Sequence, residues 1–198
     1  ITLTMLSLIV ILPVGALLAQ GASYGLTGIW STVNTPRVWA ALYLSFRLAF
    51  IAALFNLIFG TLLAWVLARY QFPGRRLVDA VVDLPFALPT AVAGIALTTL
   101  YAPNGVFGSV FKSLGVKIAY TEYGILIALI FVGLPFVTRT VQPVMEAIDR
   151  EVEEAAATLG ANRFQTVFRV LLPGLAPAVL TGFALAFARA VGEYGSVI

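Results

Sequence analysis

Nine of the charged residues of this chain lie in or around one polar stretch, and their types favour recognition over catalysis. The chain holds no cysteine and no histidine, which excludes thiol nucleophiles, Ser-His and Cys-His catalysis and the usual transition-metal sites. We therefore predict no catalytic residue, no metal site and no cofactor bound by this chain. The charges in or around the polar stretch are Glu146, Asp149, Glu151, Glu153, Glu154, Arg139, Arg150, Arg163 and Arg169.

The polar stretch begins with a predicted helix that ends at Gly160. Asp149 is placed to cap this helix, and Glu151 and Glu153 follow in its first turn, where the helix dipole favours acids. A glycine commonly follows a helix C-terminus because it adopts left-handed backbone angles without strain. We therefore predict a helix between Asp149 and Gly160.

A second short helix is predicted after this turn. Asn162 and Gln165 have the spacing of a capping box, in which each side chain bonds the backbone N–H of the other residue. We expect this helix to run through about Phe168, and we expect Leu172-Pro173 to end it and begin the next apolar segment. The result is a helix-turn-helix between two apolar segments.

One face of the first helix favours a protein partner over lipid. Val152, Ala156 and Leu159 form an apolar stripe at i, i+4 and i+7. The alternative is an amphipathic helix on the inner leaflet, but such helices present Lys and Arg to anionic lipid. The polar neighbours here are carboxylates, which anionic lipid repels. We therefore interpret the stripe as a surface for a protein on the cytoplasmic side.

The rest of the chain has the composition of a polytopic membrane protein. Of its 198 residues, 61% are hydrophobic and 11% are charged, and the mean hydropathy is +1.00, unlike a soluble domain. A spanning helix needs about 20 mostly apolar residues. Pro85 and Pro89 are expected to break or kink one such segment near its start. The five predicted spans are residues 3–19, 38–68, 84–101, 123–141 and 174–191.

Basic residues between the spans predict the orientation. Residues 20–36 are expected to form an extramembrane loop, and Phe107 through Leu114 a short amphipathic helix on the outer surface. The net charge of +3 is dispersed along the chain, so it does not indicate a nucleic-acid partner. The side that we assign to the cytoplasm holds Arg69, Arg75, Arg76, Arg139, Arg150, Arg163 and Arg169, and the other side holds Arg37, Lys112 and Lys117.

Three charges fall within apolar segments. Arg47, Arg189 and Glu193 would each cost about 2.5–3.5 kcal/mol at mid-bilayer, so we expect them to face protein or water. Arg189 and Glu193 are one helical turn apart and can neutralise each other. The other interpretation is that Arg47 and Arg189 attract an anion along a path that includes the hydroxyls of Thr90 and Thr98.

Two acids near the third span are interpreted as local ion-pair partners. Asp79 and Asp83 lie close in sequence to Arg75 and Arg76. Pairing of these four charges would neutralise them at the edge of the membrane.

The polar stretch resembles the EAA motif of ABC importer permeases. The matching residues are Glu154-Ala155-Ala156, three residues, Gly160, nine residues, and Val170-x-Leu172-Pro173, with valine where that family usually has isoleucine. Other stretches resemble the sulfate/thiosulfate permease T-subunit family in particular, namely DLPFALPTAVAG at 83–94, RTVQPV at 139–144 and GEYG at 192–195.

This resemblance implies an all-α type I importer (MetI-like) transmembrane domain over residues 1–198, in the bacterial cytoplasmic membrane. The family has six spans, so we expect the last span to be absent from this chain. Residues 149–168 would form a cytoplasmic coupling-helix loop that docks on a separate ATPase dimer, which would bind ATP and Mg. The expected coupling residues are Glu154, Ala155, Ala156, Leu159, Gly160, Leu172 and Pro173.

The resemblance also implies a second, W-type permease subunit and an extracytoplasmic sulfate-binding protein, which would dock near Phe107. The expected cargo is sulfate or thiosulfate, and the alternative is molybdate or tungstate, because all are similar anions. A phosphate-binding G-x-x-x-x-G-K-[ST] loop is missing from the sequence. An ion-coupled secondary transporter is a second alternative, but Glu193 is its one candidate intramembrane carboxylate and we see no internal repeat.

Overall fold

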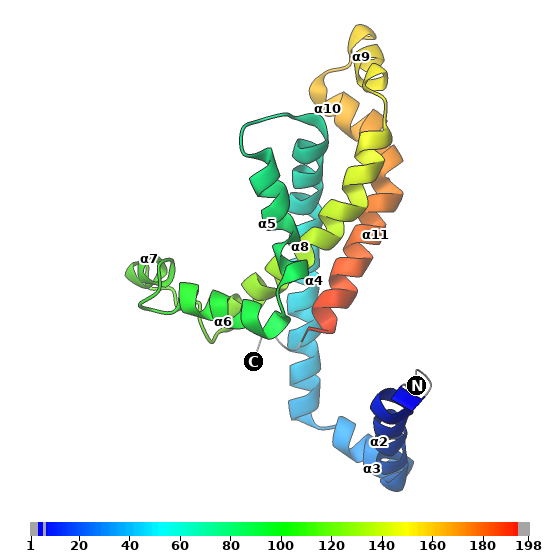
Figure 1. Ribbon diagram of the computed structural model, residues 1–198, viewed down its shortest axis with the longest axis vertical. Coiled ribbons are helices and arrows are strands. Elements are labelled where there is room, and N and C mark those ends of the chain that lie inside the picture. The colour runs from blue at the N-terminus through cyan, green and yellow to red at the C-terminus, as the bar shows by residue number, and fades with distance from the viewer. Residues whose placement is uncertain (1–3, 6, 194–198) are drawn as a thin grey trace. The chain divides into compact units, whose positions relative to one another are not determined.

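The computed structural model describes residues 4, 5 and 7–193, apart from the side chain of Leu26, and every regular element in them is helical (Figure 1). They fall into two compact units, Ile1–Ser45 and Phe46–Ile198. The elements are η1 (Ser7–Ile11), α2 (Leu12–Ser23), α3 (Gly25–Val33), α4 (Pro36–Arg69), α5 (Arg75–Ala87), α6 (Thr90–Tyr101), α7 (Gly108–Ser113), α8 (Glu122–Ala147), α9 (Arg150–Thr158), α10 (Arg163–Gln165), η2 (Thr166–Leu171) and α11 (Leu172–Val191).

Three helices are long and apolar enough to cross a membrane: Pro36–Arg69, Glu122–Ala147 and Arg163–Val191. Two further pairs of helices, each bent at a short break, pass the same test together and raise the count to as many as five. The predicted all-α polytopic fold is therefore confirmed, with the five expected spans as the upper count among the described residues. The first predicted span lies partly outside them, at residue 3 and residue 6.

The predicted extramembrane loop at residues 20–36 is wrong, because most of this segment is helical. It forms the end of α2, the whole of α3 and the start of α4. Gly25, with φ +65°, separates α2 from α3. The hydroxyls that suggested a loop instead bond carbonyls of their own helices: Ser23 donates to Gln20 at 2.7 Å, and Thr32 donates to Gly28 at 2.9 Å. Such local bonds make the polar side chains compatible with a helix.

The predicted third span is two helices rather than one. α5 begins at Arg75, before the predicted start, and α6 leaves it at an angle of 119°. The break lies at Leu88, which has extended backbone angles, and at Pro89. Proline disfavours helical angles in the residue before it and cannot donate a backbone hydrogen bond. Pro89 thus makes the predicted break, whereas Pro85 stays inside α5.

In the second unit, α8 and α11 lie side by side and form the centre of the core (Figure 1). Val137 is completely buried between them. A methyl group built at Gly182 of α11 would lie 2.9 Å from the Val137 Cα, and one at Gly60 of α4 would lie 2.9 Å from its Cβ. These two glycines therefore let three helices approach more closely than larger side chains allow.

Asp79 and Asp83 of α5 pair with Arg139 of α8, and not with the neighbouring arginines as predicted. Arg139 Nε donates to Asp83 Oδ1 and Nη2 contacts Asp83 Oδ2, both at 2.7 Å. Its Nη1 donates to Asp79 Oδ1, also at 2.7 Å. The planar guanidinium of Arg139 has enough donors to bind both carboxylates at once. Because α5 packs on α8, both aspartates are paired without a contribution from Arg75 or Arg76. The ion pairs therefore join two helices instead of neutralising one.

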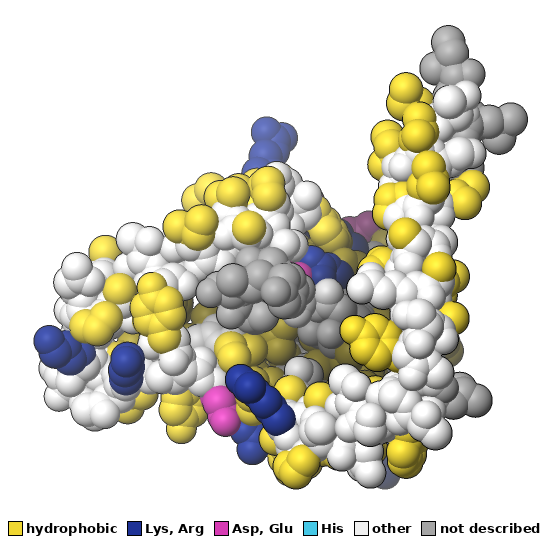
Figure 2. Space-filling view, turned by 90° about the horizontal axis from the view of Figure 1, so that it is seen from below, with side chains coloured by type: hydrophobic (Ala, Val, Ile, Leu, Met, Phe, Trp, Pro, Cys, Tyr) yellow, Lys and Arg dark blue, Asp and Glu magenta, His cyan; other side chains and the backbone are white. Residues whose placement is uncertain are grey.

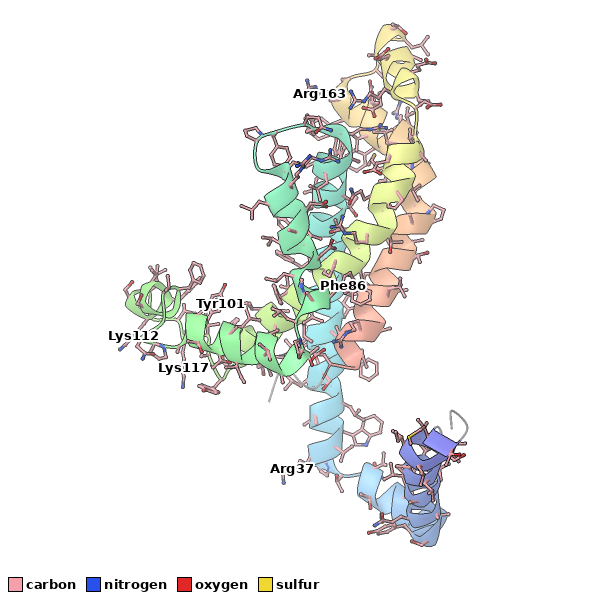
Figure 3. The ribbon with its side chains drawn as sticks, in the orientation of Figure 1. Arg37, Phe86, Tyr101, Lys112, Lys117 and Arg163 are labelled. Atoms are coloured by element: carbon pink, nitrogen blue, oxygen red, sulfur yellow. The ribbon has the colours of Figure 1, made fainter. Side chains whose placement is uncertain are left out.

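A helix is present near Phe107 as predicted, but it has only six residues, in α7. The rings of Phe107 and Phe111 lie 5.5 and 6.2 Å from Tyr101 at the end of α6. Val110 and Leu114 remain 58% and 70% exposed. In Figure 3, Lys112 and Lys117 lie beside α7, away from Arg163 beside α10. The side of the membrane that each of these residues faces stays a prediction.

Candidate functional site

Large hydrophobic side chains are widespread on the described surface, as expected of a chain that meets lipid or other subunits. Figure 2 shows them over much of one face, with few charged side chains among them. Exposed apolar residues of the spans include Phe50, Phe59, Leu62 and Leu180. Exposure of apolar residues therefore marks a functional surface here only where the segment also carries charges that a membrane would exclude.

The polar stretch meets this condition at α9, whose C-terminus is defined by Gly160. Gly160 has φ +85°. Its N–H donates to Ala157 O at 3.0 Å, and the N–H of Ala161 donates to Ala156 O at 3.0 Å. These two bonds make a Schellman motif, in which a left-handed residue satisfies the last helix carbonyls. The predicted helix end at Gly160 is confirmed.

The start of α9 differs from the prediction in one detail. Asp149 occupies the N-cap position with extended backbone angles, but its side chain makes no capping hydrogen bond. Glu151 and Glu153 lie in the first turn as predicted. Favourable interaction of these carboxylates with the helix dipole therefore remains, without a side-chain cap.

The capping box after the turn is confirmed. Asn162 Oδ1 accepts from the Gln165 N–H and Gln165 Oε1 accepts from the Asn162 N–H, both at 2.9 Å. The expected stop at Leu172-Pro173 is wrong, because the helical path continues from Arg163 to Val191. Residues 166–171 adopt π-helical bonding just before Pro173, which has no N–H to donate and is tolerated in the first turn of α11.

The predicted apolar stripe does not pack as one face. Ala156 is buried, whereas Val152 is 43% and Leu159 is 88% exposed. Leu159 lies beyond the end of α9, so it leaves the stripe. Two aromatic residues that the motif does not include, Phe164 and Phe168, are also exposed, and their rings stack with centroids 6.5 Å apart.

We call five exposed residues of this segment the α9–α10 surface: Val152, Glu154, Leu159, Phe164 and Phe168. Glu154 and Ala155 are exposed. The exposed acids of this segment, Glu151 and Glu154, lie on α9 with Val152, whereas exposed arginines adjoin the two aromatic residues. Apolar side chains next to carboxylates on α9 fit a protein groove with basic residues better than an anionic leaflet. Leu172 and Pro173 lie apart from this surface at the start of α11.

The charges within the spans are engaged in ion pairs. Arg189 pairs with Glu193, one turn along the chain, as one of the two interpretations expects. Arg47 of α4 pairs with Glu122 at the start of α8. The sequence did not suggest Glu122, because it lies just before the fourth predicted span and 75 residues from Arg47. Neither pair tests whether these arginines meet an anion.

A cavity of about 950 Å³ lies between α6 and α8 in the second unit. Thr98 and Glu122 are among its lining residues, together with Gly94, Tyr101 and Ala128. Thr90, at the first position of α6, does not line it. The structure therefore brings Thr98 and Glu122 together at one cavity, with Arg47 paired to Glu122 but not lining the cavity, and it leaves Thr90 outside.

Comparisons with known proteins agree on the family. Residues 56–197 match the family described as binding-protein-dependent transport system inner membrane component. A sulfate transport system permease protein CysT from Synechocystis sp. is 51% identical over 198 residues, which cover 100% of this chain and 69% of that protein. The protein of the same name from Escherichia coli is 48% identical over 197 residues, covering 100% of this chain and 71% of the relative.

A third relative, a probable sulfate transport system permease protein cysT from Nephroselmis olivacea, is 51% identical over 198 residues, covering 100% of this chain and 70% of its own length. The resemblance stated from the EAA motif and its flanking stretches is thus confirmed. Members of this family are permease subunits that work with a partner permease, an ATPase and a binding protein. With its all-helical spans, this chain belongs to the inner membrane components of binding-protein-dependent transport systems and is a multi-pass permease subunit of the bacterial inner membrane.

Proposed function

We propose that this permease subunit imports sulfate with energy from a separate ATPase. The observation that carries the proposal is an exposed α9–α10 surface with apolar, aromatic and acidic side chains, in a chain about half identical to sulfate permeases along its whole length. Residues 149–168 are the coupling loop, and a dimer of ATPase subunits holds ATP and Mg. The chain itself contributes movement and not hydrolysis.

Some of the coupling residues would contact the ATPase, and the others would hold the loop in shape or transmit its movement. Glu154, Ala155 and Leu159 are exposed and would meet the ATPase, whereas Ala156 is buried against the chain and Gly160 sets the turn. Leu172 and Pro173 would carry the movement into α11. A carboxylate at Glu154 suits a basic groove because complementary charge selects and orients the partner.

Exchange of Glu154 for arginine tests the site of ATPase contact. We expect Glu154→Arg to weaken co-purification of the ATPase about fivefold, because a like charge replaces the complementary one in the groove. The measurement is the ratio of ATPase to permease after affinity purification. Arg76→Gln, an exposed change at the start of α5, serves as the control. Full retention of the ATPase by Glu154→Arg would place the contact elsewhere.

The cargo is tested by uptake into vesicles that contain the assembled complex, its binding protein outside and ATP inside. We expect labelled sulfate to accumulate and molybdate or tungstate not to. Preference for molybdate would transfer the proposal to the alternative anion. Accumulation that continues without the ATPase subunit would refute the proposal of an ATP-driven importer and favour an ion-coupled carrier. A parallel sample with thiosulfate separates the two sulfur anions.

The anion path is proposed to include Arg47, Arg189 and Thr98, with Thr90 at the start of α6. Arg47 and Thr98 are associated with one cavity, the first through its pair with Glu122. We expect Arg47→Gln and Arg189→Gln each to lower sulfate uptake about fivefold, because a dianion loses a charge-assisted partner. Each is assayed separately with ATP hydrolysis as the control for assembly. Wild-type uptake by both variants would remove these arginines from the path.

The remaining partners are a second permease of the W type and an extracytoplasmic sulfate-binding protein. The binding protein is proposed to dock at the end of the unit that carries α7, where Val110 and Leu114 are exposed beside Lys112. Lipid would cover the other apolar faces of the spans.

A further inference from the structure

The end of α4 is tied to the start of α9 by contacts that lie outside the α9–α10 surface. Arg69 is the last residue of α4. Its Nη2 donates to the carbonyl oxygen of Ile148 at 2.9 Å and lies 2.9 Å from Glu153 Oε1. In return, Arg150 Nη2 donates to the carbonyl oxygen of Arg69 at 3.1 Å. The two segments that meet here are about 80 residues apart in the chain.

Both accepting carbonyls belong to helix ends. Ile148 is the C-cap of α8, and Arg69 ends α4. Carbonyls at a helix C-terminus lack partners within the helix and favour a cation. Each of these two helix ends therefore receives a guanidinium from the opposite segment. The Arg69 side chain is only 9% exposed and that of Glu153 is 29% exposed, so water competes weakly for these charge-assisted contacts.

The connection between α8 and α9 is short and lies outside both helices. It consists of Ile148 and Asp149, both with extended backbone angles. Rotation about these two residues would let α9 tilt without moving α8. Short segments of this kind act as hinges unless neighbouring contacts hold them. The contacts of Arg69 hold this hinge, because they bind Ile148 within it and Glu153 of α9 beyond it.

We propose that Arg69 is a positioning residue that locks α9 to α4, so that displacement of α9 moves the 34-residue helix α4 instead of bending the hinge. The inference rests on the proposed role of α9 as the coupling helix. It adds a second route for the force from the ATPase. The force reaches α8 and α11 through the covalent chain, and it reaches α4 through the contacts of Arg69. Loss of the lock would leave ATP hydrolysis running with little transport.

The test compares ATP hydrolysis with sulfate uptake in the reconstituted complex. We expect Arg69→Gln to keep the ATPase bound and to raise the number of ATP molecules hydrolysed per sulfate about fivefold, because the charge-assisted link is lost. Glu153→Gln, which retains the Arg69 bond to Ile148, is expected to raise the ratio about twofold. Arg76→Gln is the matched arginine control, since Arg76 lies exposed at the start of α5.

A covalent cross-link between positions 69 and 153 distinguishes a mechanical lock from a local effect of charge. The chain has no cysteine, so Arg69→Cys with Glu153→Cys introduces one addressable pair in a complex whose other subunits lack exposed cysteines. A short bis-maleimide that joins them is expected to return the ratio to within about twofold of the wild type, because a covalent bridge replaces the lost contacts. The same variant treated with a monofunctional maleimide should stay uncoupled.

Two outcomes would overturn the lock: an unchanged ratio in Arg69→Gln, or uptake and hydrolysis falling in proportion in both Arg69→Gln and Glu153→Gln. If Arg69→Gln fails to assemble, Glu153→Gln and the cross-linked pair decide alone, and an unchanged ratio in Glu153→Gln refutes the lock. Failure of the proposed function looks different, since Glu154→Arg would then retain the ATPase and wild-type uptake would need no ATP.

Discussion

Replacement of Gly160 by valine is expected to reduce ATPase binding and sulfate uptake by about fivefold to thirtyfold, because left-handed backbone angles cost about 1–2 kcal/mol in a residue with a side chain. The φ of Gly160 is +85°. No atom lies within 4 Å of a methyl group built there, so the penalty is conformational and involves no clash. Valine would shift the turn and misplace Leu159 and Phe164 on the docking surface. Co-purification and uptake are both measured.

Asparagine and alanine at the same position supply the controls. Asparagine visits left-handed angles more readily than other residues with a side chain, so Gly160→Asn is expected to retain most of the wild-type binding. Gly160→Ala should fall between the two. Equal activity of Gly160→Val and Gly160→Asn would mean that the turn geometry does not control docking.

Replacement of Gly182 by valine is expected to lower the melting temperature of the purified complex by about 6–12 °C, the effect of roughly 3 kcal/mol of overpacking in a chain of this size. A methyl group at Gly182 would lie 2.9 Å from the Cα of Val137. Because that neighbour is backbone, no rotamer change relieves the contact. α11 would have to move away from α8, and Ala186 and Ala190 would lose packing on the same face.

Gly174→Val is the matched control in the same helix. No atom lies within 4 Å of a methyl group at Gly174, so we expect its melting temperature to stay within about 2 °C of the wild type, as for an exposed substitution. Thermal unfolding followed by circular dichroism measures both variants. A similar drop in melting temperature in the two variants would show that the loss of glycine, and not the loss of close helix packing, destabilises α11.

Much of the fold could be predicted because its signals are local. A span is recognised by its length and apolar content, the end of α9 by Gly160, and the start of α10 by the spacing of Asn162 and Gln165. The failures also have local causes. Serine and threonine hydroxyls in residues 20–36 bond within their helices, and Pro173 is accommodated by π-helical bonding, so residues that usually interrupt a helix do not do so here.

The choice of ion-pair partners was beyond the sequence. Arg139 binds Asp79 and Asp83, Arg47 binds Glu122, and Arg69 binds Glu153, and each of these pairs joins residues more than fifty positions apart. Sequence spacing predicts which residues are neighbours on one helix. The partners of long-range ion pairs depend instead on which faces of different helices pack against each other. Arg189 and Glu193 could be predicted because four residues make one turn.

By itself the sequence determined the class of the protein, its apolar helices, the turn at Gly160 and the motif that leads to its family, since these depend on composition and on residues within a few positions of one another. Only the tertiary structure decided which charges meet, that Phe164 and Phe168 are exposed with stacked rings, that Thr98 lines a cavity and that Arg69 contacts Ile148 and Glu153. The physical reason is that packing of helices brings distant side chains together, and no local pattern encodes that arrangement.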